Sequence, residues 1–387
     1  MKHFTFVFLL LFASASLSLV MGEVILRATF DPIDYLHPEI MNDPVLGVRI
    51  RPYSAGHDSW GYRNKSVPEK ADIVAIGDSQ TYGVSARSRS SWPSMLQEIT
   101  GKTVYNLSLP GYDPVDYYYL MQTEAFGLNP TVIIAGFYLG NDLSEAYRNV
   151  YSRNHWERLR KADFIPEKNI ELKSAESITV KETKNRFLGS LRGWLAHHSI
   201  LYRITTFYVA DIVKFAGNRN KDINNDVTIF EDMGTGMRTA FTPSTRFGAL
   251  DTSDQRIQEG MRISLEVFSM MKKSCEQKKI RFIVLLIPTK ESVFAGYIEN
   301  KTELKNSTVI NELIVKERRV NELIKAEFNK QGVSFIESLG PLSKGAGEKQ
   351  IYPYFDGHPN GNGYRIIAET VAKFIHSAAQ TSRADKR

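Results

Sequence analysis

The feature that most constrains the fold is a series of short apolar runs that alternate with segments of helical character. The runs have the length and the aliphatic content of buried strands, and they lie at residues 71–78, 102–108, 130–142, 280–291 and 333–339. Helical start and stop signals bound further segments at residues 91–100, 114–127, 253–278, about 308–330 and 359–380. Strands that alternate with helices form a parallel sheet covered by helices on both faces. We therefore predict an α/β fold with a central parallel sheet.

The alternation is interrupted once, and the predicted domain organisation follows from that interruption. Residues 71–144 form the first part of the sheet domain, and residues 253–380 form the second part. Between them, residues 145–252 are an insertion, partly helical, that caps the site or docks a protein partner. Residues 23–70 are rich in turn-forming residues and are interpreted as an irregular lead-in. Residues 381–387 form a solvated tail.

The N-terminal segment predicts export from the cytoplasm. Residues 4–21 carry no charged side chain, and the run is at the lower end of the length that spans a bilayer. Its first half resembles the apolar region of a signal peptide, with Ala13-Ser14-Ala15 as a small-residue cleavage site. Residues 1–22 are thus a signal peptide or an N-terminal membrane anchor. Either interpretation puts the remaining chain in the periplasm or outside the cell, free or held at the membrane.

Composition excludes several classes of site. The 387 residues include a single cysteine, Cys275, so an intramolecular disulfide or a cysteine-rich metal site is ruled out. The formal net charge of +6 is spread along the chain rather than gathered in a basic block, which favours a solvated surface over nucleic-acid binding. The histidines follow no metal-ligand spacing. We expect no metal and no cofactor.

Polar residues and a glycine follow the predicted strands at the points where those strands end. Ser79 follows the first run, Gly111 the second and Asn141 the third, and His358 lies beyond the fifth. In an open parallel sheet, ligands bind beyond the carboxyl ends of the strands. Four residues far apart in the sequence should therefore meet at one edge of the sheet.

These residue types fit nucleophilic catalysis on an ester. A serine hydroxyl attacks only when a neighbouring imidazole takes its proton, which assigns Ser79 as nucleophile and His358 as base. Asp356 could accept the second ring N–H and hold the imidazole. The backbone N–H groups of Ser79 and Gly111 and the side-chain amide of Asn141 would stabilise the developing oxyanion.

Each residue also has a structural interpretation that the sequence alone leaves open. Asp78 or Ser79 could cap the helix that follows. Gly111, after Pro110, could serve only the turn, and Asn141 could be another helix cap. What favours the catalytic interpretation is the coincidence of these residues at several strand ends.

Four further residues flank the predicted site. Tyr82, Tyr112 and Tyr138 could stack on a sugar ring or line an acyl pocket, or they could pack within the fold. Lys290 follows the fourth apolar run and could bind an anionic group of the substrate. The alternative, which general lysine statistics favour, is a surface lysine.

The same residues resemble the four sequence blocks of the SGNH, or GDSL, hydrolases. The blocks are Gly77-Asp78-Ser79, Gly111, Asn141-Asp142 and Asp356-Gly357-His358-Pro359-Asn360. The resemblance covers about residues 71–142 and 280–380. It implies a flavodoxin-like three-layer α/β/α sandwich, the SGNH hydrolase fold. It also implies the same roles as above: Ser79 as nucleophile, His358 as base, Asp356 as its partner, and Ser79, Gly111 and Asn141 as the oxyanion hole.

The chain departs from the family pattern at two blocks. The third block reads Leu139-Gly140-Asn141-Asp142, with its glycine one position later than usual. In the last block only Gly357 separates the aspartate from the histidine, so another carboxylate or a backbone carbonyl could hold the ring instead. Thr81 also stands where the Gly-x-Ser-x-Gly elbow of α/β-hydrolases has its second glycine, which disfavours that fold.

The predicted function is an exported serine esterase that hydrolyses O-acyl esters, acetyl esters first, on extracellular carbohydrate through an acyl-enzyme. An O-acyltransferase would use the same residues. A non-catalytic binding or assembly protein on the same fold is the alternative from another class, because fold alone does not fix function.

Overall fold

The computed structural model describes residues 2–164, 186–206, 227–232, 237–300 and 307–384. By contacts, the chain divides into two units. We call the larger one the sheet unit; it comprises Asp43–Gly47, Val67–Ser177 and Ile223–Arg387. The N-terminal unit comprises Met1–Asn42, Val48–Ser66 and Ile178–Asp222. Each unit is described by itself below.

The sheet unit is built on a five-stranded sheet whose neighbouring strands are all parallel. Its strands are β3 (Ile73–Gly77), β4 (Val104–Ser108), β5 (Val132–Tyr138), β8 (Arg281–Ile287) and β9 (Phe335–Glu337). Their spatial order is β4-β3-β5-β8-β9, so that the second strand along the chain lies outside the first. This is the 2-1-3-4-5 order of flavodoxin-like doubly wound sheets. The predicted α/β fold with a central parallel sheet is confirmed.

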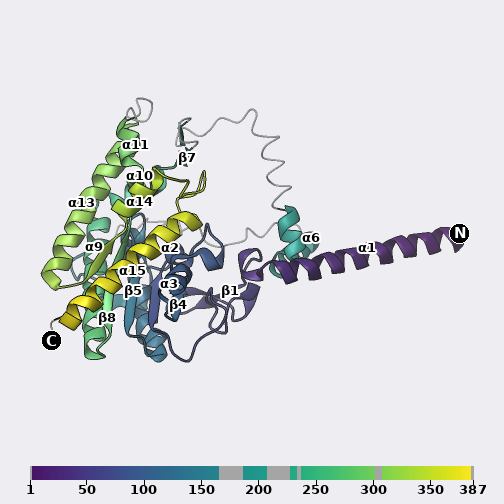
Figure 1. Ribbon diagram of the computed structural model, residues 1–387, viewed down its shortest axis with the longest axis horizontal. Helices are drawn as coiled ribbons and strands as arrows, with labels where there is room; N and C mark the ends of the chain where they lie inside the picture. The colour runs from purple at the N-terminus through teal and green to yellow at the C-terminus, as the bar shows by residue number, and fades with distance from the viewer. Residues whose placement is uncertain (1, 165–185, 207–226, 233–236, 301–306, 385–387) are drawn as a thin grey trace. The chain divides into compact units, whose positions relative to one another are not determined.

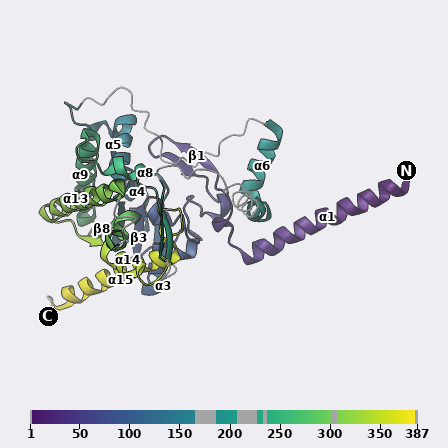
Figure 2. The ribbon, with the colours of Figure 1, turned by 90° about the horizontal axis from the view of Figure 1, so that it is seen from above.

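The two central strands β3 and β5 are apolar because both faces of the sheet are covered. Every residue of β3 and β5 is buried, as expected for strands between two helical layers. Figure 2 shows β3 and β8 between α4, α5 and α9 on one side and α3 and α15 on the other. These helices are α3 (Trp92–Thr100), α4 (Pro114–Thr123), α5 (Asp142–Ser152), α9 (Gln255–Gln277) and α15 (Gly361–Ala384).

Each helical layer buries its own apolar stripe. On one face, Trp92 and Leu96 of α3 join Ile367 of α15 in a core cluster with the sheet residue Ile134. On the other face, the ring of Phe268 in α9 lies 4.9 Å from that of Phe137 in β5. Further elements complete the sheet unit: α10 (Lys290–Val293), α11 (Ala295–Asn300), α13 (Thr308–Gln331), α14 (Leu339–Ala346), η3 (Ser88–Ser90) and η4 (Ala125–Leu128). The run of strands and helices along the chain can be followed by colour in Figure 1.

The segment predicted as one insertion, residues 145–252, contributes to both units. Its first residues belong to α5, which packs against α9, and are followed by η5 (Asn154–Leu159). Its last part forms an antiparallel hairpin in the sheet unit, β6 (Thr228–Asp232) and β7 (Met237–Phe241), then α8 (Ser244–Phe247) and η6 (Gly248–Leu250). The middle part supplies α6 (Arg186–His198) to the N-terminal unit. The polar tract at residues 218–226 lies outside the described residues.

The N-terminal unit begins with a long apolar helix, α1 (Lys2–Thr29). Within it, His3–Thr29 has a mean hydropathy of 2.3 and is long and apolar enough to cross a membrane, a test that a signal sequence at this position also passes. The helix extends beyond residue 22, the predicted end of the signal peptide or anchor, to Thr29. In this last part the carboxylate of Glu23 accepts hydrogen bonds from the N–H groups of Ile200 and Leu201 and from the hydroxyl of Ser199. These groups open a helical stretch at residues 200–206, where a carboxylate satisfies the unpaired N–H groups.

The predicted irregular lead-in, residues 23–70, is more ordered than expected. Besides the end of α1, it contains the paired strands β1 (Ile40–Asp43) and β2 (Gly47–Ile50). Two short helical turns flank them, η1 (Pro32–Asp34) and η2 (Ser54–Gly56). The pairing of β1 with β2 could not be predicted from the sequence, because each strand has only four residues, too few to show a periodic pattern.

Candidate active site

Ser79 occupies the first position of α2 (Ser79–Tyr82), the short helix that follows β3. Asp78 caps this helix, its Oδ1 accepting the N–H of Gln80 at 2.9 Å. Gly83 ends it in the left-handed region, with φ of +85°. The N–H groups at the start of a helix have no partner within the helix. The capping interpretation thus applies to Asp78 and leaves both the hydroxyl and the N–H of Ser79 for another purpose.

The turn that carries Ser79 lies close against the sheet. The hydroxyl of Thr81 occupies the space where a Cβ atom on Gly77 of β3 or on Gly136 of β5 would stand. Both glycines are therefore required by a close approach of α2 to the strands. Thr81, two residues after the serine, thus fills a space that would be empty if position 81 were glycine, as it is in the Gly-x-Ser-x-Gly elbow.

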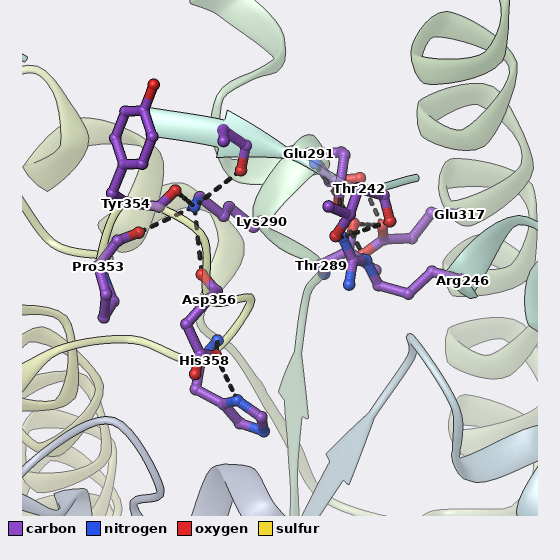
Figure 3. Close-up of polar contacts among 12 residues, drawn as sticks. Thr242, Arg246, Thr289, Lys290, Glu291, Glu317, Pro353, Tyr354, Asp356 and His358 are labelled. Atoms are coloured by element: carbon purple, nitrogen blue, oxygen red, sulfur yellow. Dashed lines mark hydrogen bonds and ion pairs between the residues drawn. The ribbon is translucent and has the colours of Figure 1, made fainter. Parts of the chain in front are cut away.

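The structure brings Ser79, His358 and Asp356 together in one chain of hydrogen bonds. Ser79 Oγ lies 2.8 Å from Nε2 of His358, and Nδ1 of the same ring lies 2.6 Å from Oδ1 of Asp356. Figure 3 shows the ring of His358 turned back toward Asp356. The single intervening residue is sufficient because the loop folds on itself, with the His358 N–H also donating to Asp356 Oδ1 at 2.8 Å.

The charges at the site favour an ionised Asp356. Burial opposes ionisation, but hydrogen bonds from His358, the charge of its ring and a hydrogen bond from Ser85 lower the pKa of the Asp356 carboxyl far below its usual value. A carboxylate in this position fixes the ring tautomer that leaves Nε2 free to accept a proton.

A second carboxyl group, that of Asp78, also reaches the serine. Asp78 Oδ2 lies 3.2 Å from Ser79 Oγ, a longer contact than that to His358. Asp78 is fully buried, and burial raises the pKa of its carboxyl to about 6, against hydrogen bonds from Gln80 and Ser79. The hydroxyl proton of Ser79 therefore has two acceptors, of which His358 is the nearer.

The predicted oxyanion donors lie on the two strands that flank β3. Gly111 follows β4 and Asn141 follows β5, and the sheet order places these strands on either side of β3. Gly111 has a φ of +87°, a conformation that favours glycine. It is exposed, and Ser79 and Asn141 are partly exposed, so that solvent reaches this edge of the sheet.

Asn141 stands at the capping position of α5, yet its side chain makes no capping hydrogen bond. Its Oδ1 is buried and has no hydrogen-bond partner among the described residues. Asp142 holds the turn instead: its carboxylate accepts the backbone N–H of Tyr138 at 3.0 Å and the hydroxyl of Tyr117 at 3.2 Å. Asn141 thus occupies the cap position of α5, but its side chain does not serve as the cap.

The three tyrosines have different environments. Tyr112 and Tyr138 are buried, at 1% and 6% exposure, and pack within the fold. Burial raises the pKa of Tyr138 well above its ordinary value. Tyr82, at the end of α2, is partly exposed. Of the three, Tyr82 alone remains a candidate for contact with a substrate.

Lys290 differs most from expectation, since the interpretation as a surface lysine is wrong. The residue is 1% exposed, and its Nζ donates to four backbone carbonyls. An ammonium group directed at carbonyls in the interior is also not placed to bind an anionic substrate. The acceptors come from distant parts of the chain, so that no local signal could have revealed the burial.

Three other residues near the site were not found from the sequence. Ser85 donates its hydroxyl to Asp356. Arg246, from α8, pairs with the buried Glu291 and lies against Gly357. Of these three residues, only Glu291 had a signal in the sequence, a carboxylate a few positions after the end of the buried strand β8. Among the described residues, no group of three or more His, Cys, Asp or Glu side chains could hold a metal ion.

Comparisons with known proteins found similarity only to solved structures. No family model matches the sequence, and no curated protein matches it. Among solved structures, a protein described as lipolytic, of the G-D-S-L family of Desulfitobacterium hafniense, is 12% identical with a TM-score of 0.35, and the match covers 79% of this chain and 99% of that one.

Two other similar structures have comparable scores. A GDSL-like lipase from Bacteroides thetaiotaomicron is 11% identical, with a TM-score of 0.34 and coverage of 79% and 88% of the two chains. A catalytic mutant of an acetylxylan esterase from Geobacillus stearothermophilus is 8% identical, with a TM-score of 0.35 and coverage of 79% and 94%. These similarities are remote, and the function proposed next rests on the geometry of this chain.

Proposed function

We propose that this chain is an SGNH-type serine esterase that hydrolyses small O-acyl esters through an acyl-enzyme. The observation that carries the proposal is the hydrogen-bonded series Ser79–His358–Asp356, which links a hydroxyl, an imidazole and a carboxylate at 2.8 and 2.6 Å. Nucleophile, base and orienting acid in this arrangement are what acyl transfer to serine requires.

The reaction proceeds in two steps. Ser79 Oγ attacks the ester carbonyl carbon while Nε2 of His358 takes the hydroxyl proton, and the bond to the alcohol oxygen then breaks as His358 returns that proton to the alcohol. In the second step a water molecule, deprotonated by His358, attacks the acyl group on Ser79. The acid is released and Ser79 recovers its proton. Asp356 stabilises the imidazolium in both steps.

The oxyanion hole comprises the N–H of Ser79, the N–H of Gly111 and the amide of Asn141. Two features support this assignment. The Ser79 N–H opens a helix, and the Asn141 side chain is not used for capping. Each such donor stabilises the charge of the tetrahedral intermediate, and the loss of one typically lowers kcat about 10²–10³-fold.

The proposed substrates are acetyl or other short acyl esters of extracellular carbohydrate. Two exposed apolar side chains beside the triad, Val84 and Phe355, support a substrate with an apolar face. They are joined to the site through their neighbours Ser85 and Asp356, which hydrogen bond to one another. An exposed aromatic ring can contact the apolar face of a sugar. Export is inferred from the apolar helix α1.

The test is covalent labelling of the full-length chain with a fluorophosphonate, together with hydrolysis of an aryl acetate. We expect the adduct on Ser79, identified by peptide mapping. Ser79→Ala should abolish labelling and lower kcat by about 10⁶-fold, the order of magnitude known for loss of a serine nucleophile. Ser274→Ala is the matched control, because Ser274 lies on α9 and hydrogen bonds only to the exposed side chain of Gln122 among the described residues.

Turnover that survives Ser79→Ala would remove the nucleophile assignment. An acyltransferase would give a different pattern: labelling of Ser79 with slow release of acetate, accelerated by an added glycan that receives the acyl group.

A further inference from the structure

Lys290 lies directly behind the loop that carries the predicted base. Its Nζ donates to the carbonyl oxygens of Pro353, Tyr354 and Asp356 at 3.0, 3.0 and 3.1 Å, and to that of Ala240 in β7 at 3.1 Å. Figure 3 shows these acceptors arranged around the Nζ atom. One side chain thus holds the main chain of residues 353–356, which leads into His358, and ties it to the β6–β7 hairpin.

The burial of this lysine has no stabilising ion pair to offset it. Among the described residues, Lys290 forms no salt bridge. Its charge is balanced by carbonyl dipoles, by carboxylates farther away and by the rings of Phe241 and Tyr352, whose centroids lie 6.0 and 5.8 Å from Nζ. Removing an ammonium group from water is costly unless its hydrogens are all bonded. With three hydrogens and four carbonyl acceptors, the group is fully used within the protein. It holds the loop rather than contacting a ligand.

The next residue acts on the same loop from a second direction. Glu291 is fully buried, and its carboxylate accepts hydrogen bonds from Nε and Nη2 of Arg246. A Cβ atom on Gly357 would lie 3.2 Å from Nη1 of that arginine. The guanidinium group therefore lies against the single residue that separates Asp356 from His358.

The short helix that carries Lys290 and Glu291 is itself held in place. Thr289 caps α10, and its N–H and hydroxyl both donate to the carboxylate of Glu317 in α13. Ser292 donates its hydroxyl to the same carboxylate. The start of α10 thus provides a fixed point, connected to β8 on one side and to α13 on the other.

We propose that Lys290 is a positioning residue for the base: its four hydrogen bonds fix the backbone of residues 353–356 so that Asp356 and His358 keep the geometry needed to deprotonate Ser79. This proposal rests on the esterase function proposed above. It assigns to Lys290 a role in kcat, without any contact to substrate.

The test compares Lys290→Met, Lys290→Arg and the control Lys325→Met in the full-length chain. Methionine keeps the length and the apolar stem but donates no hydrogen bond, whereas arginine keeps the charge and several donors. Lys325, on α13, pairs with Glu337 at 2.8 Å and does not touch the base loop. For aryl acetate, Lys290→Met should lower kcat about 10–100-fold, since small misplacements of catalytic groups have this cost.

Three further readouts separate positioning from a merely structural role. KM should change less than twofold in Lys290→Met, and Lys290→Arg should recover a part of kcat. The thermal unfolding midpoint identifies a variant that fails to fold. The Nδ1–H proton of His358 gives the readout that needs no turnover: its low-field NMR signal, assigned with His358→Asn, should be present in the wild type and Lys325→Met and lost in Lys290→Met.

The outcomes distinguish the two proposals. If the wild type neither labels nor turns over, the esterase proposal fails, while the His358 signal still tests the role of Lys290. If a folded Lys290→Met keeps both the His358 signal and wild-type kcat, the positioning role is overturned. A lowered unfolding midpoint with an unchanged His358 signal would likewise overturn it, because Lys290 would then serve stability only.

Discussion

At the scale of single residues, the site depends on how a few ionisable groups respond to burial. Ser79 has one hydroxyl proton and two acceptors, His358 at 2.8 Å and Asp78 at 3.2 Å. The two aspartates near the serine shift in opposite directions: the pKa of Asp356 is lowered, and burial raises that of Asp78 to about 6. The orienting acid is thus charged under all ordinary conditions, while Asp78 changes its charge in mildly acidic solution.

The raised pKa of Asp78 predicts an effect of pH on stability. The folded protein binds this proton more tightly than the unfolded chain, so stability falls as pH rises from the unfolded pKa toward 6 and then stays reduced. Asp78→Asn keeps the cap on Gln80 and removes the buried charge. It should raise the free energy of unfolding at pH 8, by no more than about 3 kcal/mol at about 1.4 kcal/mol per pKa unit.

Urea unfolding at pH 8 and pH 4 checks this expectation. The advantage of Asp78→Asn should disappear at pH 4, where the wild-type carboxyl is protonated when folded. Asp356→Asn is the control, and it should change the free energy of unfolding at pH 8 in the opposite direction. The lowered pKa of the Asp356 carboxyl means that its ionised form stabilises the folded protein, so its removal should destabilise the fold. An Asp78→Asn variant that is equally or less stable than the wild type at pH 8 would contradict the prediction.

Lys290 predicts an effect of pH on turnover. Burial lowers the pKa of Lys290 to about 8; Arg246 lowers it further, while Glu291 and Asp356 oppose the shift. Above that pH the amine has two hydrogens for four carbonyls. The kcat for an aryl acetate should therefore fall with a midpoint near pH 8. In Lys290→Arg, whose guanidinium remains charged, the plateau should extend to higher pH. The same alkaline limb in both proteins would contradict this expectation.

At the scale of secondary-structure elements, the sequence predicted what depends on local pattern and missed what depends on distant partners. The five apolar runs all contain strands, and α13, expected at about residues 308–330, spans Thr308–Gln331. The hairpin formed by β6 and β7 was missed because its strands, Thr228–Asp232 and Met237–Phe241, mix charged and apolar residues and form no sustained apolar run. The burial of Lys290 could not be predicted, since its acceptors are backbone carbonyls, which any residue type supplies.

The turns after the strands were predicted at the correct places, but with uncertain roles. The sequence located Ser79, Gly111, Asn141 and His358, because a polar residue or glycine that ends an apolar run is a local signal. It could not decide between a helix cap and an oxyanion donor at Asn141. The structure shows that the Asn141 side chain makes no capping hydrogen bond, a contact that the sequence could not predict, and its role as an oxyanion donor remains a proposal.

The turn between β5 and α5 predicts the outcome of substituting Asn141. Because the Asn141 side chain makes no capping bond, Asn141→Ala should leave the thermal unfolding midpoint nearly unchanged. Loss of an oxyanion donor should nevertheless lower kcat about 10²–10³-fold. Asn321→Ala is the matched control, since Asn321 lies on α13 and donates to Glu337. An Asn141→Ala variant with wild-type kcat would remove Asn141 from the oxyanion hole.

At the scale of the whole molecule, the chain joins an α/β sheet unit to an N-terminal unit that begins with an apolar helix. Most side chains of α1 between Phe4 and Ile25 are exposed, and within its 18-residue apolar window none of the surface is buried. An exposed apolar surface of this size is typical of a segment that contacts a membrane or a protein partner, and a signal sequence at this position has the same character. The tie between Glu23 and residues 199–201 shows that the end of this helix is part of the N-terminal unit.

We therefore expect the full-length chain to fractionate with membranes when expressed. A variant that lacks residues 2–21 keeps Glu23 and should be soluble, with kcat/KM for an aryl acetate within about twofold of the full-length chain, because the residues removed belong to the N-terminal unit and the proposed triad belongs to the sheet unit. N-terminal sequencing of the membrane fraction distinguishes an anchor from a signal peptide. A soluble full-length chain with an intact N-terminus would contradict the prediction.

The packing of Thr81 against Gly77 and Gly136 limits which substitutions these three positions can accept. One hydroxyl-bearing side chain fills the volume that would belong to side chains on two adjacent strands. Alanine at either position would push the serine-bearing turn off the sheet and away from His358. Conversely, glycine in place of Thr81 would leave a void beneath that turn. The three positions are therefore sterically coupled, so that a larger residue at either glycine requires a smaller one at position 81 if the serine-bearing turn is to stay in place.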